Sequence, residues 1–444
     1  MTRLLRLLLA CFAVAFVATP ARSQISFTTA VDLALKNSPR VKMAEADVAR
    51  ARASQEEARD VYIPTVGAAS SAGGYSYGFP LGTPTVFSLS AQSLVFSFSQ
   101  RDYMRSASSG LDAAILTLRD VRDQVAEDAA VTYLSLDRAQ QQRSALAEEA
   151  THALRLENIV NDRLEGGQDT AMELTKARRT SVQIRLQSLQ TDDEIASFAD
   201  HLARLIGLPG TPIAALSDSI PALPPNAPIP PPSDTPGVRA AFASARSKRE
   251  QAFGDARYTW RPQISLGAEY SRFSTYNNNY VQYYPGIQNQ PNAFGFDFAI
   301  SLPLLDMGRR AKARQSAAEA VRLEHEATYD RDQVSEGRLK LQHSSAELAA
   351  RADLASLDRD LAQQQLEVIL VQAASGSSTG PLVTPKDEES ARIQERQRYV
   401  EMLDADFQLR QAKVQLLRQT GELDGWLNSA AAGSAAGSLT VAKP

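Results

Sequence analysis

Four short stretches of the chain alternate between apolar residues and small or polar ones. In one of them, Ile264, Leu266 and Ala268 alternate with Ser265 and Gly267. A period of two residues places the two sets of side chains on opposite faces of a β-strand. The pattern therefore predicts two strands within about 62–98 and two within about 262–304, each with one apolar face. The apolar positions are Val66, Ala68, Phe87, Leu89, Ala91, Leu94, Phe96 and Phe98, with a change of phase near Gln92, and Tyr270, Phe294, Phe296, Phe298, Ile300, Leu302 and Leu304.

The stretches that follow each pair of strands have the composition of very long helices. Gln100–Asp162 and Arg309–Ala374 contain no proline and are rich in Ala, Leu, Gln, Glu and Arg, which are strong helix formers. At 1.5 Å per residue each would extend about 95–100 Å, which indicates coiled coils rather than a globular core. After a Gly- or Ser-rich break, return helices are predicted over Asp169–Ile206 and Pro385–Leu427.

The same order of elements occurs twice. A helix that starts near Ser38-Pro39 and is stopped by Pro64 corresponds to one that starts near Thr235-Pro236 and is stopped by Pro262. We predict a first repeat over 24–208, with its helical hairpin at about 100–207, and a second over 236–428, with its hairpin at about 306–427. The Pro-rich stretch 209–235 between them is predicted to be an extended linker outside any packed core. The Ala-, Gly- and Ser-rich tail 429–444 is predicted to be disordered.

The strands have two possible interpretations. Strands of about ten residues with one apolar face are typical of a transmembrane β-barrel, and the alternative is the hairpin of a soluble β-sandwich. Because even small barrels need about eight strands, a barrel built from this sequence requires several chains.

The first 23 residues have the layout of a secretory signal peptide. Arg3 and Arg6 precede the apolar run Leu7–Val17, and small residues lead to a cleavage site after Ser23. An alternative is a lipoprotein cleavage box ending at Cys11, the only cysteine. The chain has 47 Lys and Arg against 51 Asp and Glu, a net charge of −4, and cleavage would change it to −7. This balance gives no basic surface for nucleic acid.

The tandem order of helix, two strands and long helical hairpin behind a signal peptide resembles the TolC-like outer-membrane efflux family. The resemblance covers about Phe27–Leu427 and includes the helix starts at Pro39 and Pro236, the strand-to-helix junction 302–308 and the closing segment Leu417–Leu427. It implies a mainly α-helical homotrimer, in which each chain gives four strands to a twelve-stranded β-barrel in outer-membrane lipid and its helices to an α-barrel across the periplasm. The implied function is the passive exit channel of a tripartite efflux or type I secretion system, with a periplasmic adaptor and an inner-membrane pump as partners.

Two sets of site residues follow from this resemblance. The first hairpin tip, Arg163, Leu164, Glu165, Gly166 and Gly167, is similar to the turn that faces the adaptor, although Gly167 could simply end a helix.

Asp387 aligns with an acidic residue that the family often has near the periplasmic constriction of its pore, whereas the next family acid would align with Ser390. In three chains, Asp387, Glu388 and Glu389 would form a negative ring at this constriction, which favours cations. The alternative for Asp387 is a helix cap, because Thr384-Pro385-Lys386-Asp387 is the pattern of an N-cap, a first-turn proline and an acid at the third helical position. The second hairpin turn also departs from the family, since it is about five residues longer than the first. Phe294, Phe296, Phe298 and Ile300 are the predicted lipid-facing residues.

Other functions have less support in the sequence. The four His residues show no metal-ligand spacing, and neither a nucleophile elbow nor a phosphate-binding loop is present. We therefore expect no enzyme activity, cofactor or metal. The main alternative is a periplasmic adaptor or coiled-coil scaffold, which should have one hairpin flanked by small β domains instead of two hairpins with apolar strands.

Overall fold

The computed structural model describes residues 23–71, 86–224, 234–273, 292–375 and 383–429. Nearly all of the predicted signal peptide and of the predicted tail lies outside these ranges, as does the turn 376–382. The chain forms two compact units, one of residues 44–119 and 236–333 and the other of the remaining residues. Each unit combines segments from both halves of the sequence.

The element order of the first half returns in the second. After α2 (Phe27–Asn37), the first half contains α3 (Pro39–Asp60), β2 (Thr65–Ser71), β3 (Val86–Ser97), α4 (Phe98–Glu165) and α5 (Ala171–Leu205). The second half contains α6 (Pro236–Tyr258), β5 (Gln263–Phe273), β6 (Asn292–Ser301), α8 (Met307–Ser375) and α9 (Pro385–Thr420). Helices α4 and α8 have 68 and 69 residues. The predicted strands and the predicted long helices are therefore present.

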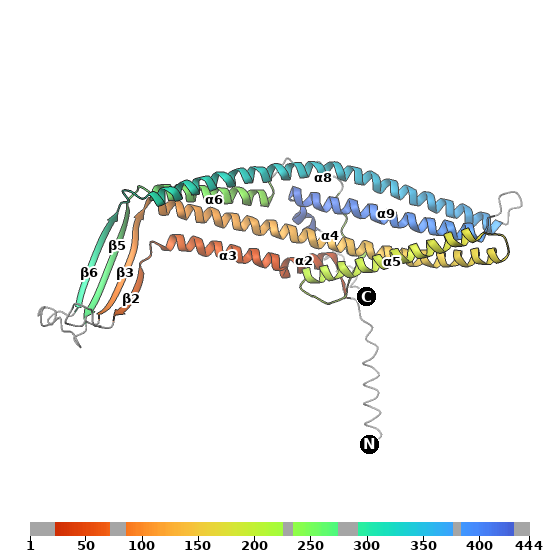
Figure 1. The fold of residues 1–444 in the computed structure, drawn as a ribbon, viewed down its shortest axis with the longest axis horizontal. Helices are drawn as coiled ribbons and strands as arrows, with labels where there is room; N and C mark the ends of the chain where they lie inside the picture. Colours follow the sequence, from red (N-terminus) through yellow and green to blue (C-terminus); the bar gives the residue numbers. More distant parts are fainter. Residues whose placement is uncertain (1–22, 72–85, 225–233, 274–291, 376–382, 430–444) are drawn as a thin grey trace, which may run out of the picture. The chain divides into compact units, whose positions relative to one another are not determined.

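The unit of residues 44–119 and 236–333 contains a four-stranded antiparallel sheet in the order β2-β3-β5-β6 (Figure 1). Strand β3 carries a bulge, because its register against β5 shifts between Leu94 and Phe96. The bulge produces the predicted change of phase, but three residues later than Gln92. Leu94 consequently pairs opposite Ser265 on the polar side of the sheet, and Phe98 is the first residue of α4. The expected place of these two residues in the apolar strand face was wrong.

Polar contacts hold the helices of this unit together. Tyr103 on α4 donates a hydrogen bond of 2.7 Å to Asp255 on α6, and Arg257 contacts Asp102 at 2.8 Å. Gly254 makes the close approach possible, since a Cβ at this position would lie 2.7 Å from the Tyr103 ring. Burial raises the pKa of Tyr103 and its hydrogen bond to Asp255 raises it further, so its hydroxyl stays protonated and serves as the donor.

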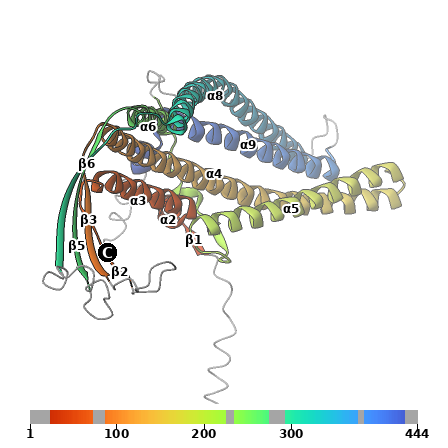
Figure 2. The same cartoon turned by 60° about the vertical axis from the view of Figure 1, so that its left-hand side comes forward.

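The other unit contains α5, α9 and the parts of α4 and α8 that follow residues 119 and 333, which together form two helical hairpins, α4 with α5 and α8 with α9. Both views place α9 between α8 and the α4–α5 hairpin (Figures 1 and 2). Small and aliphatic side chains from three helices form a continuous core near the hairpin tips, as the coiled-coil pattern predicts. Its buried members are Leu146, Ala153, Leu156 and Val160 of α4, Leu174, Ala177 and Ile184 of α5, and Ile393 of α9.

Part of the predicted linker is packed, which corrects the expectation for 209–235. Strand β4 (Ile213–Ala215) pairs in parallel with β1 (Ser23–Ile25), and the 3₁₀ turn η1 (Ser217–Ser219) follows. Tyr133, which is fully buried, donates its hydroxyl to the carbonyl of Ile25 at 2.8 Å. The reason is local: Ile213–Ala215 is an apolar run without proline, so it can donate and accept strand hydrogen bonds inside the Pro-rich stretch.

The last helix also differs from the prediction. Helix α9 ends at Thr420, because Gly421 takes a left-handed conformation with φ of 76°, and a short helix follows at 423–429. Trp426 of that short helix packs against Phe27 with a ring-centroid distance of 5.5 Å. The break at Gly421 therefore directs the end of the chain onto the β1–β4 region.

Within the described ranges, every helix is too short or too polar to cross a membrane by itself.

Candidate functional site

One face of the sheet is apolar across all four strands. The strand register places Phe296 of β6 beside Ala268 of β5, Ala268 beside Ala91 of β3, and Ala91 beside Val66 of β2. Directly paired residues of antiparallel strands share a face. The four aromatic and aliphatic positions predicted on β6 all lie on this face, and they are 61–72% exposed. These residues are Phe294, Phe296, Phe298 and Ile300.

The opposite face is small and polar. It carries Gln92 and Ser90 on β3, Glu269 on β5 and Asp297 on β6. Gly267 pairs with Asp297, and the Asp297 carboxylate occupies the space where a Cβ of residue 267 would stand. A larger residue at Gly267 would therefore displace this carboxylate. The sheet is therefore two-sided, with a broad apolar face that is open to its surroundings.

The sheet has two open edges. Strands β2 and β6 each pair with only one neighbour among the described strands. An exposed strand edge offers unpaired N–H and C=O groups to another strand. Among the described strands, both edges of the sheet are thus open to pairing with another strand.

The tip of the α4–α5 hairpin is a tight, ordered turn. Gly167 adopts a φ of 73°, and the Arg163 guanidinium spans the turn to reach Asp169 at 3.0 Å. Thr170 accepts the backbone N–H of Glu173 and so caps α5. The left-handed conformation of Gly167 follows the end of α4 at Glu165, so the helix-ending role given above as the alternative for Gly167 is present. Of the other predicted tip residues, Leu164 packs against the hydrophobic core, while Glu165 and Gly166 are exposed.

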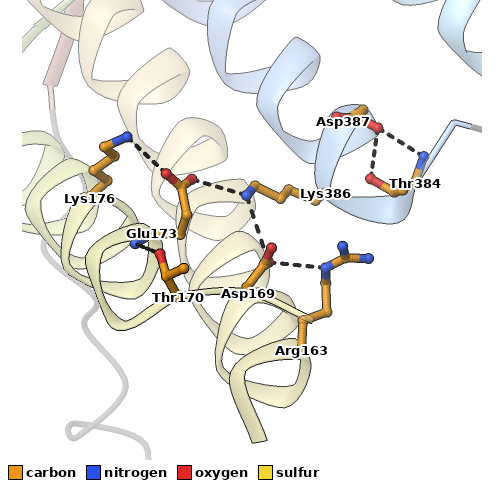
Figure 3. A network of polar contacts seen from close by, with 8 residues as sticks. All are labelled: Arg163, Asp169, Thr170, Glu173, Lys176, Thr384, Lys386 and Asp387. Atoms are coloured by element: carbon orange, nitrogen blue, oxygen red, sulfur yellow. Dashed lines mark hydrogen bonds and ion pairs between the residues drawn. The ribbon is translucent and has the colours of Figure 1, made fainter. Parts of the chain in front are cut away.

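A lysine of α9 joins the two hairpins at this tip (Figure 3). Lys386 Nζ lies 3.0 Å from Glu173 and 3.7 Å from Asp169, both on the α4–α5 side. Lys176 contacts Glu173 from within α5 at 2.8 Å. Hydrogen bonds from Lys176 and Lys386 lower the pKa of Glu173. The tip thus carries an alternating network of charges that the sequence spacing did not predict.

Of the three acids predicted at a pore constriction, Asp387 and Glu388 lie in the first turn of α9 and Glu389 follows directly, and each has its own partner. Asp387 forms a capping box with Thr384, accepting its backbone N–H at 2.9 Å and its hydroxyl at 2.7 Å. These hydrogen bonds lower the pKa of Asp387. Glu388 pairs with Arg392 at 2.7 Å. The capping role that was the alternative for Asp387 is therefore present.

Glu389 points into the protein instead. It is only 9% exposed, and its Oε2 lies 2.6 Å from Nδ1 of His152 on α4. Arg155 adds a longer contact at 3.9 Å. Because His152 and Glu389 are 237 residues apart, no local signal in the sequence could have revealed the pair.

Further polar contacts follow the α4–α9 interface. Gln397 donates to Glu149 at 2.9 Å, and Glu149 is 1% exposed, so burial raises the pKa of this carboxyl. Arg138 reaches Asp404 on α9 at 2.7 Å and Glu194 on α5 at 2.6 Å. The two helices are held by specific polar pairs as well as by apolar packing.

The described residues contain no group of three or more His, Cys, Asp or Glu side chains arranged to hold a metal ion.

The comparisons with known proteins agree with this architecture. Residues 30–208 match the family model described as outer membrane efflux protein. The outer-membrane channel OprN superposes with a TM-score of 0.73 at 15% identity, covering 90% of each chain. The outer membrane protein VceC of Vibrio cholerae gives 0.70 at 17%, covering 89% of this chain and 96% of its own. The outer membrane channel MtrE of Neisseria gonorrhoeae gives 0.71 at 15%, covering 90% and 89%. No curated protein matches by sequence.

Proposed function

We propose that this chain, whose residues 30–208 match the outer membrane efflux protein family model, is an outer-membrane channel of a tripartite efflux or type I secretion system. The observation that carries the proposal is the open four-stranded sheet with one apolar face. A soluble protein would leave this face in water, where it costs free energy, whereas a lipid bilayer accommodates it.

Barrel closure requires more than one copy. Four strands are too few to close, and three copies related by a threefold axis would supply twelve strands. The free edge of β6 in one copy would then pair with the free edge of β2 in the next. In this arrangement Phe294, Phe296, Phe298 and Ile300 face lipid, and Glu269 and Asp297 face a polar lumen.

The helical hairpins would continue the channel into the periplasm. In this proposal the chain is exported with its signal peptide, 1–23, and is inserted into the outer membrane. It offers a passive route to the cell exterior and catalyses no reaction itself, because an inner-membrane pump supplies the energy. The exposed hairpin tip around Glu165–Gly167 would contact the periplasmic adaptor, and its ordered turn supports that role, since a rigid surface loses little entropy on binding.

The acids at the start of α9 would line the periplasmic constriction. Asp387 is exposed, Glu388 is half-buried and Glu389 is buried against His152. Copies of Asp387 and Glu388 around a threefold axis would make a negative ring that favours cations. Glu389 would then position the ring by holding the first turn of α9 on α4.

Purified protein in planar lipid bilayers tests this function. We expect discrete conductance steps that prefer cations. A variant with Asp387, Glu388 and Glu389 all replaced by Ala should lose most of that preference, and Glu401→Ala, an exposed acid farther along α9, serves as the matched control. Failure of the wild-type protein to insert and conduct would contradict the channel, and an unchanged preference in the triple variant would contradict the acidic constriction alone.

A further inference from the structure

Helices α4, α6 and α8 meet the sheet at one of its ends (Figure 1). Ser97 of β3 pairs with Gln263 of β5, and Gln263 pairs with Ser301 of β6, so these three strands share that end. Helix α4 begins directly after β3, α6 ends shortly before β5, and α8 begins shortly after β6. The stretches 98–105, 255–262 and 302–314 are called the junction below.

Two arginines of the junction stack on aromatic rings that extend the apolar face of the sheet. Phe96 belongs to that face through its pairing with β5, and the Phe98 ring contacts the Phe96 ring at a centroid distance of 4.8 Å. The Arg101 guanidinium lies 5.2 Å from the centre of the Phe96 ring. The Arg261 guanidinium lies 5.1 Å from the Phe98 ring centre and 4.0 Å from that of Trp260. Both cations therefore stand at the edge of the apolar face where the helices begin.

Neither of these arginines is neutralised within the described chain. Among the residues that the structure describes, Arg101 and Arg261 form no ion pair. The acids of the junction already have other partners: Asp102 contacts Arg257 at 2.8 Å, Asp255 accepts a hydrogen bond from Tyr103 at 2.7 Å, and Asp306 contacts Arg309 at 3.0 Å. The two stacked guanidiniums therefore keep an uncompensated positive charge and donors for a ligand.

The surroundings of the two arginines are both basic and apolar. The basic residues of the junction outnumber its three acids, and they are Arg101, Arg105, Arg257, Arg261, Arg309, Arg310, Lys312 and Arg314. The nearby end of α3 adds Arg59 and Asp60, whose charges balance. Apolar side chains of the junction are 50–83% exposed, and they are Trp260, Leu302, Leu304, Leu305 and Met307. Cations mixed with exposed aromatic and aliphatic groups are typical of a surface at the boundary between lipid chains and headgroups.

We propose that the junction binds an anionic phospholipid, whose phosphate contacts the guanidiniums of Arg101 and Arg261 and whose acyl chains lie along the apolar face. The inference rests on the proposed outer-membrane channel and names the class of lipid that one region of it holds. Guanidinium groups form charge-assisted hydrogen bonds with phosphate oxygens, and the stacked rings limit the orientations of both side chains. In the proposed channel the helices enter the periplasm, so this lipid belongs to the periplasmic leaflet.

An anionic lipid fits this surface better than other phosphate ligands. Free phosphate would contact the cations alone and leave Trp260, Leu304 and Leu305 in water, where their exposure costs free energy. A zwitterionic headgroup brings its own ammonium, which the basic surroundings repel. Phosphatidylglycerol has one phosphate, a net negative charge and two acyl chains, so it matches the cations and the apolar face together.

Native mass spectrometry of the full-length protein extracted in detergent tests this site. With phosphatidylglycerol and phosphatidylcholine added in equal amounts, the wild type should retain phosphatidylglycerol about fivefold more than phosphatidylcholine. The double variant Arg101→Gln, Arg261→Gln should lose most of this preference, because it removes both guanidiniums. The matched control is Arg52→Gln, Arg249→Gln, which removes the same charge from exposed positions about 12–14 Å before the ends of α3 and α6. The control should retain the wild-type preference.

A conservative variant separates geometry from charge. Arg101→Lys with Arg261→Lys keeps both positive charges but not the planar donors, so its preference should lie between those of the wild type and the glutamine variant. Equal retention of the two lipids by the wild type would overturn the site, and so would an equal loss in the two glutamine double variants. Displacement of the lipid by added inorganic phosphate would overturn it as well. Each of these results leaves the channel intact, whereas a monomer released without detergent would contradict the proposed function itself.

Discussion

Nδ1 of His152 on α4 lies 2.6 Å from Oε2 of Glu389 on α9, and their side chains are only 16% and 12% exposed. One turn earlier, Lys386 links the start of α9 to Glu173 and Asp169 at the tip of the other hairpin. These contacts fasten the first turn of α9 to the α4–α5 hairpin from two sides. The residues proposed to form the constriction therefore belong to a helix start that polar contacts hold in place on the α4–α5 hairpin.

Loss of the Glu389 carboxylate should weaken the attachment of the start of α9 to α4. Glu389→Ala leaves His152 and Arg155 without their acceptor, and we expect it to lower the free energy of unfolding by about 1–3 kcal/mol. Glu389→Gln retains an acceptor oxygen and should cost less. Thermal unfolding of the detergent-solubilised protein, followed by circular dichroism, measures both. Wild-type stability in the alanine variant would show that the pair contributes nothing.

The capping box at Thr384 should make α9 sensitive to acid. Because the pKa of Asp387 is lowered from its ordinary 3.8, its contribution to stability is complete above 3.8 and is lost as the pH falls through the lower value in the folded protein. Thr384→Ala and Asp387→Asn should each destabilise α9 at pH 7 by about 1 kcal/mol. The difference between wild type and Asp387→Asn should shrink towards about pH 2. A deficit that stays constant over this range would argue against the ionised cap.

Glu149 should show the opposite pH dependence. Burial raises its pKa above the ordinary 4.5, so its favourable state is the protonated one, and stability is lost as the pH rises through the raised value. Glu149→Gln keeps the shape and a hydrogen-bonding partner for Gln397 without the charge. The variant should therefore be more stable than wild type at about pH 8 and nearly equal to it at about pH 4.

The neighbouring Glu148→Gln is the control, because Glu148 is 52% exposed and pairs with Arg396 at the surface. Melting temperatures across this pH range provide the measurement. Parallel curves for wild type and Glu149→Gln would refute the role of the buried carboxyl.

A charge on the apolar sheet face should prevent assembly in the membrane. Phe296→Arg places a guanidinium where lipid is expected and should cost about 2–4 kcal/mol. Ala299→Arg, three residues along β6 but on the polar face, should be tolerated much better. The yield of folded oligomer extracted from outer membranes reports the effect. Equal yields for the two variants would mean that the proposed orientation of the sheet is wrong.

Periodic signals in the sequence predicted the regular elements well. The alternation around Phe296 marks β6, and the absence of proline marks α4 and α8. Local breaks were harder to place. The bulge in β3 occurs at the Leu94–Phe96 step rather than at Gln92, and Gly421 ends α9 six residues before the predicted Leu427. Both depend on how a single residue bends the backbone, and hydrophobic periodicity does not report that.

Contacts between distant segments could not be predicted from the sequence. The Thr384–Asp387 cap was foreseeable because its members are three residues apart. By contrast, the His152–Glu389 pair depends on how α9 packs against α4, and Tyr133 reaches Ile25 only because β1 and β4 pair. Residue spacing reports on contacts within a single helix or strand. It carries no information on contacts between elements that only the tertiary structure brings together.

The mass of the detergent-extracted particle tests the central proposal most directly. Native mass spectrometry of the protein solubilised from outer membranes should give three times the mass of the mature chain, which is slightly below the 48.2 kDa of the full sequence. Three chains supply the strands that one open sheet of four lacks. A monomer released from the periplasm without detergent would contradict the channel.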